Sequence, residues 1–164
     1  LYTALRQQVQ LAVLQGDEAV IIERLSAVDA VGLTSQVGGH LPLHCSGVGK
    51  VLLSHSSPEF IDEVLSGRLR RFTPRTIVDP AELRRELASC RSTGTVVAKE
   101  ELSEGAESVA TRIVDGHGRV VAALSVVVAA GSIKLQAAVP SLVASGLGLS
   151  RSLGWRPGIP IRTS

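Results

Sequence analysis

The chain has 164 residues, 45% of them hydrophobic and 20% charged, which supports one folded domain and excludes a disordered chain. Its formal net charge of +2 is too small for a nucleic-acid-binding surface, and its 2% aromatic content is too low for a base-stacking platform. Cys45 and Cys90 form no CxxC motif, which argues against a disulfide scaffold or a zinc site and favours reduced thiols in a cytoplasmic protein. No segment has the pattern of a signal peptide or a membrane span.

The first quarter of the chain predicts a short helix followed by three strands. Residues 1–7 are expected to be the last turns of a helix that begins outside the chain, which suggests a fragment. Residues 9–14 and 19–25 are two apolar runs separated by Gln15-Gly16-Asp17-Glu18, a turn that predicts a hairpin. Residues 31–37 alternate apolar and polar side chains and predict a third strand, which residues 38–42 end.

Capping signals predict three helices in the middle of the chain. Ser46 is the expected N-cap of a helix over residues 46–54. Ser57 and Pro58 open a second helix that Gly67 ends, and Asp79 followed by Pro80 opens a third. The buried stripe of the third helix is expected to contain Leu83, Leu87 and Cys90.

The last part of the chain predicts three strands and a long helix. Residues 95–98 form a strand, residues 99–105 a charged loop, and residues 106–114 and 119–130 a hairpin. Residues 132–153 form a closing helix that tolerates Pro140. The whole order predicts an α+β fold with a mostly antiparallel sheet of five or six strands, in one domain over residues 1–155 with a loose tail at residues 156–164.

The run Gly47-Val48-Gly49-Lys50 does not form a phosphate-binding loop. That motif requires Gly at position 44 and Ser or Thr at position 51, where His44 and Val51 stand. A helix N-terminus remains, and the backbone N–H groups of Gly47 and Val48 can bind a carboxylate there. The alternative is an N-terminus capped only by Ser46 and water.

No group of residues predicts catalysis, a metal site or a cofactor site. His40 and His44 have the spacing of a helical metal pair, but Pro42 between them excludes the helix. His44 has no partner to orient it as a base for Cys45, which is expected in the core. The acidic residues Glu100, Glu101, Glu104 and Glu107 are expected on a solvated loop, and the basic residues Arg68, Arg70, Arg71 and Arg75 on the surface or at a subunit contact.

The last hairpin predicts two neighbouring hydroxyl groups. A symmetric turn centred between Gly116 and His117 places Ser108 opposite Ser125, with Ala106 opposite Val127 on the same face. Two serines on an otherwise apolar sheet either form the floor of a pocket or hydrogen-bond each other inside a packed core.

Several segments, in order, resemble IclR-type transcriptional regulators. Residues 41–53, LPLHCSGVGKVLL, resemble the family pattern LP-x-H-A-[ST]-x-x-GK-x-x-L, and residues 72–77, FTPRTI, resemble its RFTPNTI segment. Asp79-Pro80, the EEL of residues 100–102 and the DGHGRVVAALSVVV of residues 115–128 follow at matching spacing. The resemblance extends over about residues 9–153.

This resemblance implies the C-terminal effector-binding domain of such a regulator, without its N-terminal winged helix-turn-helix. The implied fold is GAF-like or profilin-like, with a curved antiparallel sheet flanked by helices. Family members form homodimers or homotetramers, most often repress transcription, and change their affinity for DNA when a small molecule binds. DNA contact would require the absent domain.

The resemblance also implies an effector site, where the helix after LP-x-H faces the sheet. Gly47 and Val48 supply N–H groups, Leu33 supplies an apolar wall, and Ser108 and Ser125 supply hydroxyls. Ala98 and Val127 stand where members have an acid or a further serine, which predicts a less polar pocket. The expected effector is therefore an aromatic or larger organic acid, and not an acid of the size of glyoxylate.

Two other functions are compatible with the sequence. The domain can serve only for oligomerisation, with its pocket filled by side chains. It can also be an enzyme that uses Cys45 or the Glu100 and Glu101 pair, although no base and nucleophile are paired in the sequence.

Overall fold

The computed structural model describes residues 1–26, 36–132 and 134–163. Within these residues the order of elements is the predicted one, a short helix, three strands, three helices, three strands and a helix. The elements are α1 (Tyr2–Leu5), β1 (Gln8–Gln15), β2 (Glu18–Leu25), β3 (His40–Pro42), α2 (Gly47–Ser54), α3 (Pro58–Ser66), α4 (Pro80–Thr93), β4 (Thr95–Lys99), β5 (Ala106–Val114), β6 (Val120–Ala129) and α5 (Lys134–Ser152).

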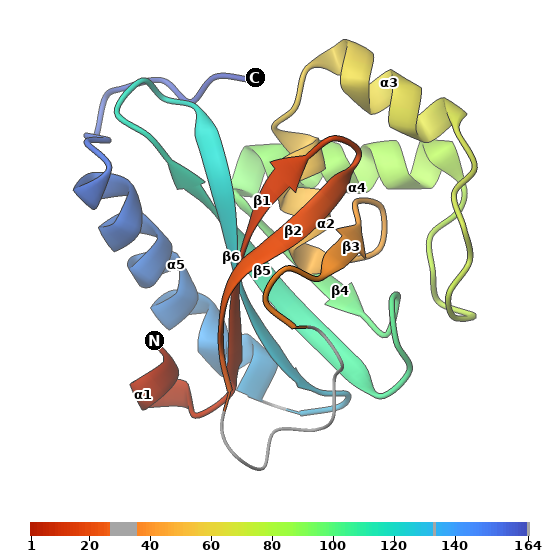
Figure 1. The fold of residues 1–164 in the computed structure, drawn as a ribbon, viewed down its shortest axis with the longest axis horizontal. Coiled ribbons are helices and arrows are strands. Elements are labelled where there is room, and N and C mark those ends of the chain that lie inside the picture. Colours follow the sequence, from red (N-terminus) through yellow and green to blue (C-terminus); the bar gives the residue numbers. More distant parts are fainter. Residues whose placement is uncertain (27–35, 133, 164) are drawn as a thin grey trace.

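The strands form one curved antiparallel sheet with the order β3-β2-β1-β6-β5-β4 (Figure 1). This confirms the predicted fold class. The long pairing of β1 with β6 joins the N-terminal hairpin to the C-terminal one.

The third strand differs from the prediction. Most of residues 31–37 lies outside the described residues, whereas residues 40–42, which were predicted to end a strand, form β3. Pro42 has no N–H to donate to a ladder, but β3 pairs only with β2 and lies at the edge of the sheet. An edge strand tolerates proline because only one of its sides needs partners.

Local capping signals account for the starts of α2, α3 and α4, as predicted. The hydroxyl of Ser46 accepts a hydrogen bond from Gly49 N (3.1 Å), that of Ser57 from Phe60 N (3.2 Å), and the carboxylate of Asp79 from Glu82 N (3.0 Å). Each cap satisfies one of the N–H groups that a helix start leaves without an intrahelical partner.

Helices cover the sheet on two sides (Figure 1). One core lies between the sheet and the layer of α2, α3 and α4, and includes Leu53, Leu83 and Leu87. The other lies between the sheet and α5, and includes Val126, Leu135 and Leu142. Side chains of the central strands alternate between these two cores, so both faces of β6 are buried near its middle, as its apolar sequence predicts.

The register of the last hairpin differs from the prediction by two residues. Ser108 pairs with Val127 and Ser125 with Ala110, so Ser108 does not face Ser125. The turn between the paired Val114 and Val120 has five residues, 115–119, which is one more on the β6 side than in the predicted symmetric turn. The register shift between Ile113 and Val114 adds a second. Because the total shift is even, both serines stay on the predicted face.

The C-terminal helix α5 continues through Pro140, as predicted. After it, the backbone N–H of Arg162 donates to the carbonyl of Gly118 (2.7 Å), and Trp155 Nε1 donates to the carbonyl of Ile159 (3.3 Å). None of the helices described has the length and hydrophobicity needed to cross a membrane.

Candidate functional site

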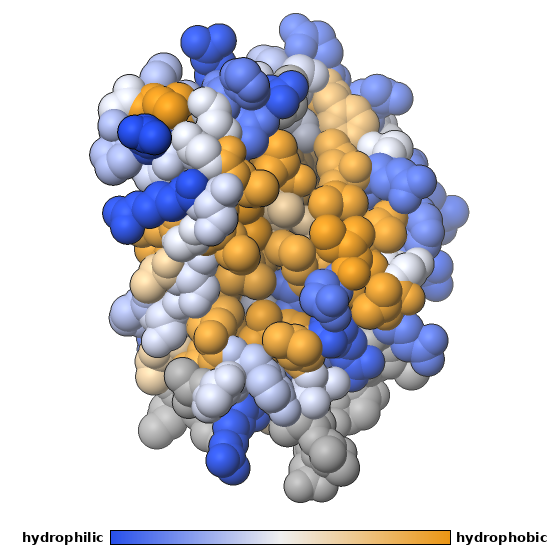
Figure 2. All heavy atoms as spheres, turned by 60° about the vertical axis from the view of Figure 1, so that its left-hand side comes forward, coloured by the Kyte–Doolittle hydropathy of each residue, from blue (hydrophilic) through white to orange (hydrophobic). Residues whose placement is uncertain are grey.

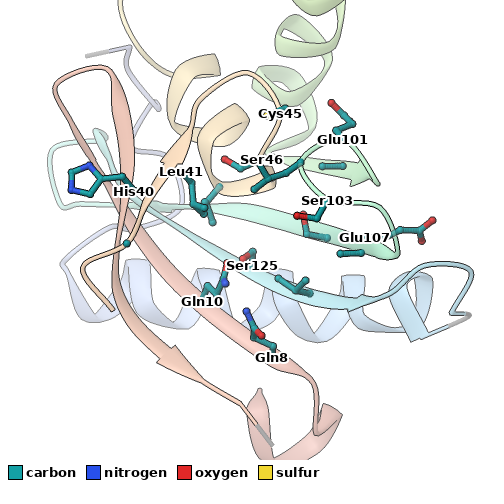
Figure 3. Close-up of a pocket in the computed structure, with 18 of the residues that line it drawn as sticks. Gln8, Gln10, His40, Leu41, Cys45, Ser46, Glu101, Ser103, Glu107 and Ser125 are labelled. Atoms are coloured by element: carbon teal, nitrogen blue, oxygen red, sulfur yellow. The ribbon is translucent and has the colours of Figure 1, made fainter. Parts of the chain in front are cut away.

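A cavity of about 510 Å³ lies between the start of α2 and the sheet. The sheet supplies its floor from four adjacent strands, the start of α2 lies above it, and the loop after β4 forms one side (Figure 3). Its size suits a small organic molecule. The cavity contradicts the packed core that an oligomerisation-only module would have at this position.

Strand register explains which side chains form the floor. One row across the sheet is Gln8, Val127, Ser108 and Ala98, each paired with the next. The neighbouring row places Gln10 opposite Ser125 on β6. Since side chains of a strand alternate between faces, both rows point to the α2 side.

Glycine allows the start of α2 to pack closely in two directions, at Gly47 against this floor and at Gly49 against the segment that precedes the helix. A Cβ on Gly47 would lie 2.7 Å from Ser108 Oγ, and a Cβ on Gly49 would lie 2.6 Å from the carbonyl oxygen of Pro42. Both distances are shorter than real Cβ contacts. Gly47 therefore brings the N–H groups of the first helical turn to the cavity, and the positive end of the helix dipole with them.

Lys50, one turn into α2, holds a buried ion-pair network beside the cavity. Its side chain is fully buried, and Nζ lies 2.7 and 2.6 Å from the two carboxylate oxygens of Glu101 and 3.0 Å from Glu86 Oε2. Glu101 also lines the cavity and is 6% exposed, so the expectation of a solvated acidic loop is wrong for this residue. Burial raises the pKa of the Glu101 carboxyl, and the nearby Lys50 ammonium opposes that rise.

Loop hydrogen bonds fix the Glu101 backbone in place. The hydroxyl of Thr76 donates to the carbonyl of Glu101 (2.6 Å), and that of Thr73 donates to the carbonyl of Glu100 (2.6 Å). The FTPRTI segment thus holds the loop that carries Glu101, and Lys50 holds its carboxylate.

The hydroxyl of Ser125 is a polar group suited to a ligand. The residue is 1% exposed and lines the cavity, and among the residues that the structure describes its Oγ has no hydrogen-bond partner. A buried hydroxyl without a partner carries a desolvation cost of about 1–3 kcal/mol. A ligand atom that hydrogen-bonds Ser125 would remove that cost.

Cys45 and His44 do not form a nucleophile and base. Cys45 lines the cavity, whereas His44 lines a second cavity of about 370 Å³ and its Nε2 lies 2.8 Å from the carbonyl oxygen of Arg70. Burial raises the pKa of the Cys45 thiol to about 12, and the carboxylate of Glu101 adds to the rise. At neutral pH the thiol is therefore protonated and a poor nucleophile.

Six of the seven predicted site residues line the cavity together: Gly47, Val48, Ala98, Ser108, Ser125 and Val127. The seventh, Leu33, lies outside the described residues. Sequence reasoning missed Gln8 and Gln10, which are 2% and 5% exposed on the cavity floor, and Glu101 on its side. The two glutamines had a signal, because they are polar residues two apart in an otherwise apolar strand.

Comparisons with known proteins agree with this arrangement. Residues 1–147 match the family model for the bacterial transcriptional regulator IclR C-terminal domain. The HTH-type transcriptional repressor AllR of Escherichia coli K12 is 39% identical over 121 residues, 73% of this chain and 45% of AllR. The chain thus spans less than half the length of this curated relative.

Solved structures show the same fold. An IclR homolog from Microbacterium hydrocarbonoxydans, solved with 4-hydroxybenzoate, is 38% identical with a TM-score of 0.89, over 93% of this chain and 62% of that one. The IclR of Thermotoga maritima is 28% identical with a TM-score of 0.87, over 93% of this chain and 64% of that one. The match of the family model to most of the chain, together with these relatives, confirms the resemblance seen in the sequence: the chain belongs to the IclR family of bacterial transcriptional regulators, and its described fold is that family's C-terminal domain.

Proposed function

We propose that the cavity binds a small organic acid and that this binding controls the DNA affinity of a cytoplasmic regulator. The observation that carries the proposal is a cavity with a helix N-terminus on one side and the partnerless Ser125 hydroxyl on its floor. The regulator would self-associate, act as a repressor like the relative AllR, and contact DNA through a region equivalent to the part of AllR that the match does not cover.

The carboxylate of the ligand would lie at the start of α2. Ser46 caps Gly49 N, so the N–H groups of Gly47 and Val48 remain for an anion. The carboxylate of Glu101, which lies at the side of the cavity, disfavours a second ligand carboxylate beside it. Lys50 is already paired with Glu101, so among the residues that the structure describes that wall offers no free cationic side chain to a second acid group.

The remainder of the ligand would be apolar with one distal polar group. Ala98, Val127 and Leu41 supply apolar surface, and Ser125 supplies the hydroxyl. The volume is large for an acid of the size of glyoxylate and suits an aromatic or medium-chain acid. The neighbour from Microbacterium hydrocarbonoxydans supports this class, because it was solved with 4-hydroxybenzoate.

A thermal-shift panel tests the ligand class. Benzoate, 4-hydroxybenzoate, octanoate and glyoxylate are added at the same concentrations, and the melting temperature is recorded. Ligand at a hundred times its dissociation constant adds about 2.7 kcal/mol, which raises the melting temperature of a domain of this size by several degrees. The proposal predicts a rise with an aromatic or medium-chain acid and none with glyoxylate. A rise with glyoxylate alone would contradict the ligand class, and no rise with any acid would contradict the proposal.

A single-atom variant tests the role of Ser125. Ser125→Ala removes a buried hydroxyl without a partner, so the free protein should keep or gain stability. The same change should weaken 4-hydroxybenzoate about five- to tenfold while leaving benzoate unaffected, because a neutral hydrogen bond contributes about 1 kcal/mol. Equal losses for both acids would show that Ser125 does not contact the distal hydroxyl. Ser89→Ala, an exposed serine on α4, is the matched control.

A further inference from the structure

The second cavity, of about 370 Å³, is distinct from the first cavity beside the start of α2. Its walls come from the turn between β1 and β2, from residues 42–44, from α3 and from the segment that follows α3 (Figure 1). Residues 42–44 line the second cavity, whereas residues 40–41 and 45–46 on either side of them line the first. Among the residues that the structure describes, none lines both cavities, so a ligand in one does not use the contacts of the other.

Apolar side chains form much of the lining of the second cavity. Leu43 belongs to the buried core around α2, and Phe60, Val64 and Leu69 pack against that core. Phe72 lines the cavity as well, and this large aromatic side chain is 39% exposed. An apolar group in the cavity would remove part of the Phe72 ring from water, which favours binding of a ligand with an apolar portion.

His44 supplies a hydrogen-bond acceptor in this apolar lining. The residue is 7% exposed, and its Nε2 lies 2.8 Å from the carbonyl oxygen of Arg70. Because a carbonyl can only accept, Nε2 carries the proton and donates it. Burial lowers the pKa of the ring, so His44 is uncharged at neutral pH and its Nδ1 is an acceptor. Nδ1 makes no hydrogen bond to the residues that the structure describes, so an N–H group of a ligand can bind there.

Charged side chains of both signs also line the second cavity. Asp17 in the β1–β2 turn, Glu63 on α3 and Arg68 after α3 have no ion-pair partner within the described part of the chain. Exposed charges do pair nearby, since Arg84 Nη2 lies 2.7 Å from Asp62 Oδ1. The α5 side of the molecule is different, because apolar side chains gather there in a broad patch (Figure 2). The second cavity therefore offers unpaired charges of both signs beside an apolar wall.

We propose that the second cavity binds an α-amino acid with an apolar side chain. The ammonium group of the amino acid would donate to Nδ1 of His44, and its carboxylate would pair with Arg68. Its side chain would lie against the rings of Phe60 and Phe72. A simple carboxylic acid would leave the His44 acceptor without a donor and would bring a negative charge near Glu63, whereas a simple amine would leave Arg68 unpaired. The volume suits a molecule of the size of phenylalanine.

Amide chemical-shift mapping shows whether and where a probe amino acid binds. L-Phenylalanine is titrated into the ¹⁵N-labelled wild-type chain, and amide shifts are followed in ¹H–¹⁵N correlation spectra. The proposal predicts saturable shifts for residues 43–44 and 69–72, and none for Ser125 or Val127 on the floor of the first cavity. No saturable shift up to the solubility limit of the amino acid would overturn the proposal, and so would shifts confined to the first cavity.

Two analogues of the probe test the need for both charges. L-Phenylalaninol keeps the ammonium group and lacks the carboxylate, whereas 3-phenylpropionate keeps the carboxylate and lacks the ammonium group. Dissociation constants are read from the amides of residues 43–44 and 69–72, so binding of the acid in the first cavity does not affect the comparison. Each analogue should bind the second cavity more weakly than L-phenylalanine. Equal or tighter binding of either analogue there would contradict the proposed ligand class.

Arg68→Glu tests the carboxylate end of the site, with circular dichroism to check folding. Arg68 is exposed and its ion pair with the ligand would be partly solvated, so the change should weaken L-phenylalanine about fivefold. L-Phenylalaninol, which has no carboxylate, should not weaken. Arg85→Glu, on the exposed surface of α4 outside the cavity, is the matched control and should change neither probe.

The same variants separate this site from the effector site. Arg68→Glu should bind 4-hydroxybenzoate as the wild type does, because Arg68 does not line the first cavity. Equal losses of L-phenylalanine and L-phenylalaninol in Arg68→Glu would overturn the proposed placement of the carboxylate. A loss of L-phenylalanine in Arg85→Glu as large as in Arg68→Glu would also overturn it.

Discussion

Replacing Lys50 by Met tests the buried ion-pair network beside the cavity. The side chain of Lys50 is fully buried, and its Nζ lies 2.6–2.7 Å from both carboxylate oxygens of Glu101. Its other partner, Glu86, is partly exposed to solvent. Methionine keeps most of the volume but leaves Glu101 as a buried carboxylate without a counter-ion. Breaking a buried pair in this way costs about 3–5 kcal/mol of unfolding free energy. For a domain of this size that lowers the melting temperature by roughly 10 °C.

The pH dependence of this loss identifies its cause. Without Lys50, burial raises the folded-state pKa of Glu101 further above its unfolded value. A raised folded pKa means that stability is present below the unfolded pKa and is lost as the pH rises. The deficit of Lys50→Met relative to wild type should therefore be largest near neutral pH and smaller near pH 4.5, the ordinary pKa of a glutamate.

The assay is urea unfolding followed by circular dichroism at several pH values, on wild type, Lys50→Met, Glu101→Gln and the double variant. The double variant should lose less than the sum of the two single losses, because the buried charge is gone. Glu86→Gln is the matched control and should cost less than about 1 kcal/mol, since its carboxylate is 24% exposed. A Lys50→Met loss below about 1 kcal/mol, or one that does not change with pH, would refute the reasoning.

Three further predictions rest on single groups. Burial lowers the pKa of His55 to about 4, so the unfolding free energy should fall by roughly 3 kcal/mol as the pH drops from about 6.5 to 4. His55→Gln should remove most of this pH dependence, which is measured by chemical unfolding at several pH values. Gly49→Ala should lower the unfolding free energy by about 1–3 kcal/mol despite the higher helix propensity of alanine, because the new Cβ meets the Pro42 carbonyl; an unchanged urea midpoint would contradict this. The Cys45 thiol, whose pKa burial raises to about 12, should resist iodoacetamide at pH 8 in the folded protein and react in urea, and rapid alkylation of the native chain at Cys45 would be inconsistent with that burial.

Local signals predicted most of the fold. Ser46, Ser57 and Asp79 cap their helices through hydrogen bonds within three residues, so sequence spacing is enough to locate them. Strand register was less predictable, because it depends on an odd-length turn and on a bulge at Ile113 and Val114 that no residue type announces. The edge strand β3 was missed because Pro42 indicates a break unless its place at the edge of the sheet is known.

The candidate site was likewise predictable only in part. The resemblance brought together residues from α2, β4, β5 and β6, and the structure places them around one cavity. Glu101 could not be found from the sequence, because an acidic residue in a charged loop looks solvated until its partner is known. That partner, Lys50, is 51 positions away, and only the tertiary fold brings the two together.

Calorimetric titration of 4-hydroxybenzoate tests the central claim, that the cavity is an effector site, most directly. Val127→Phe fills the cavity from its floor, and Ser89→Ala on the surface of α4 serves as the control. The account predicts saturable binding of one acid per chain by wild type and by Ser89→Ala, and at least a tenfold loss in Val127→Phe with the fold intact. Binding of equal strength in all three proteins would place the ligand elsewhere and contradict the account.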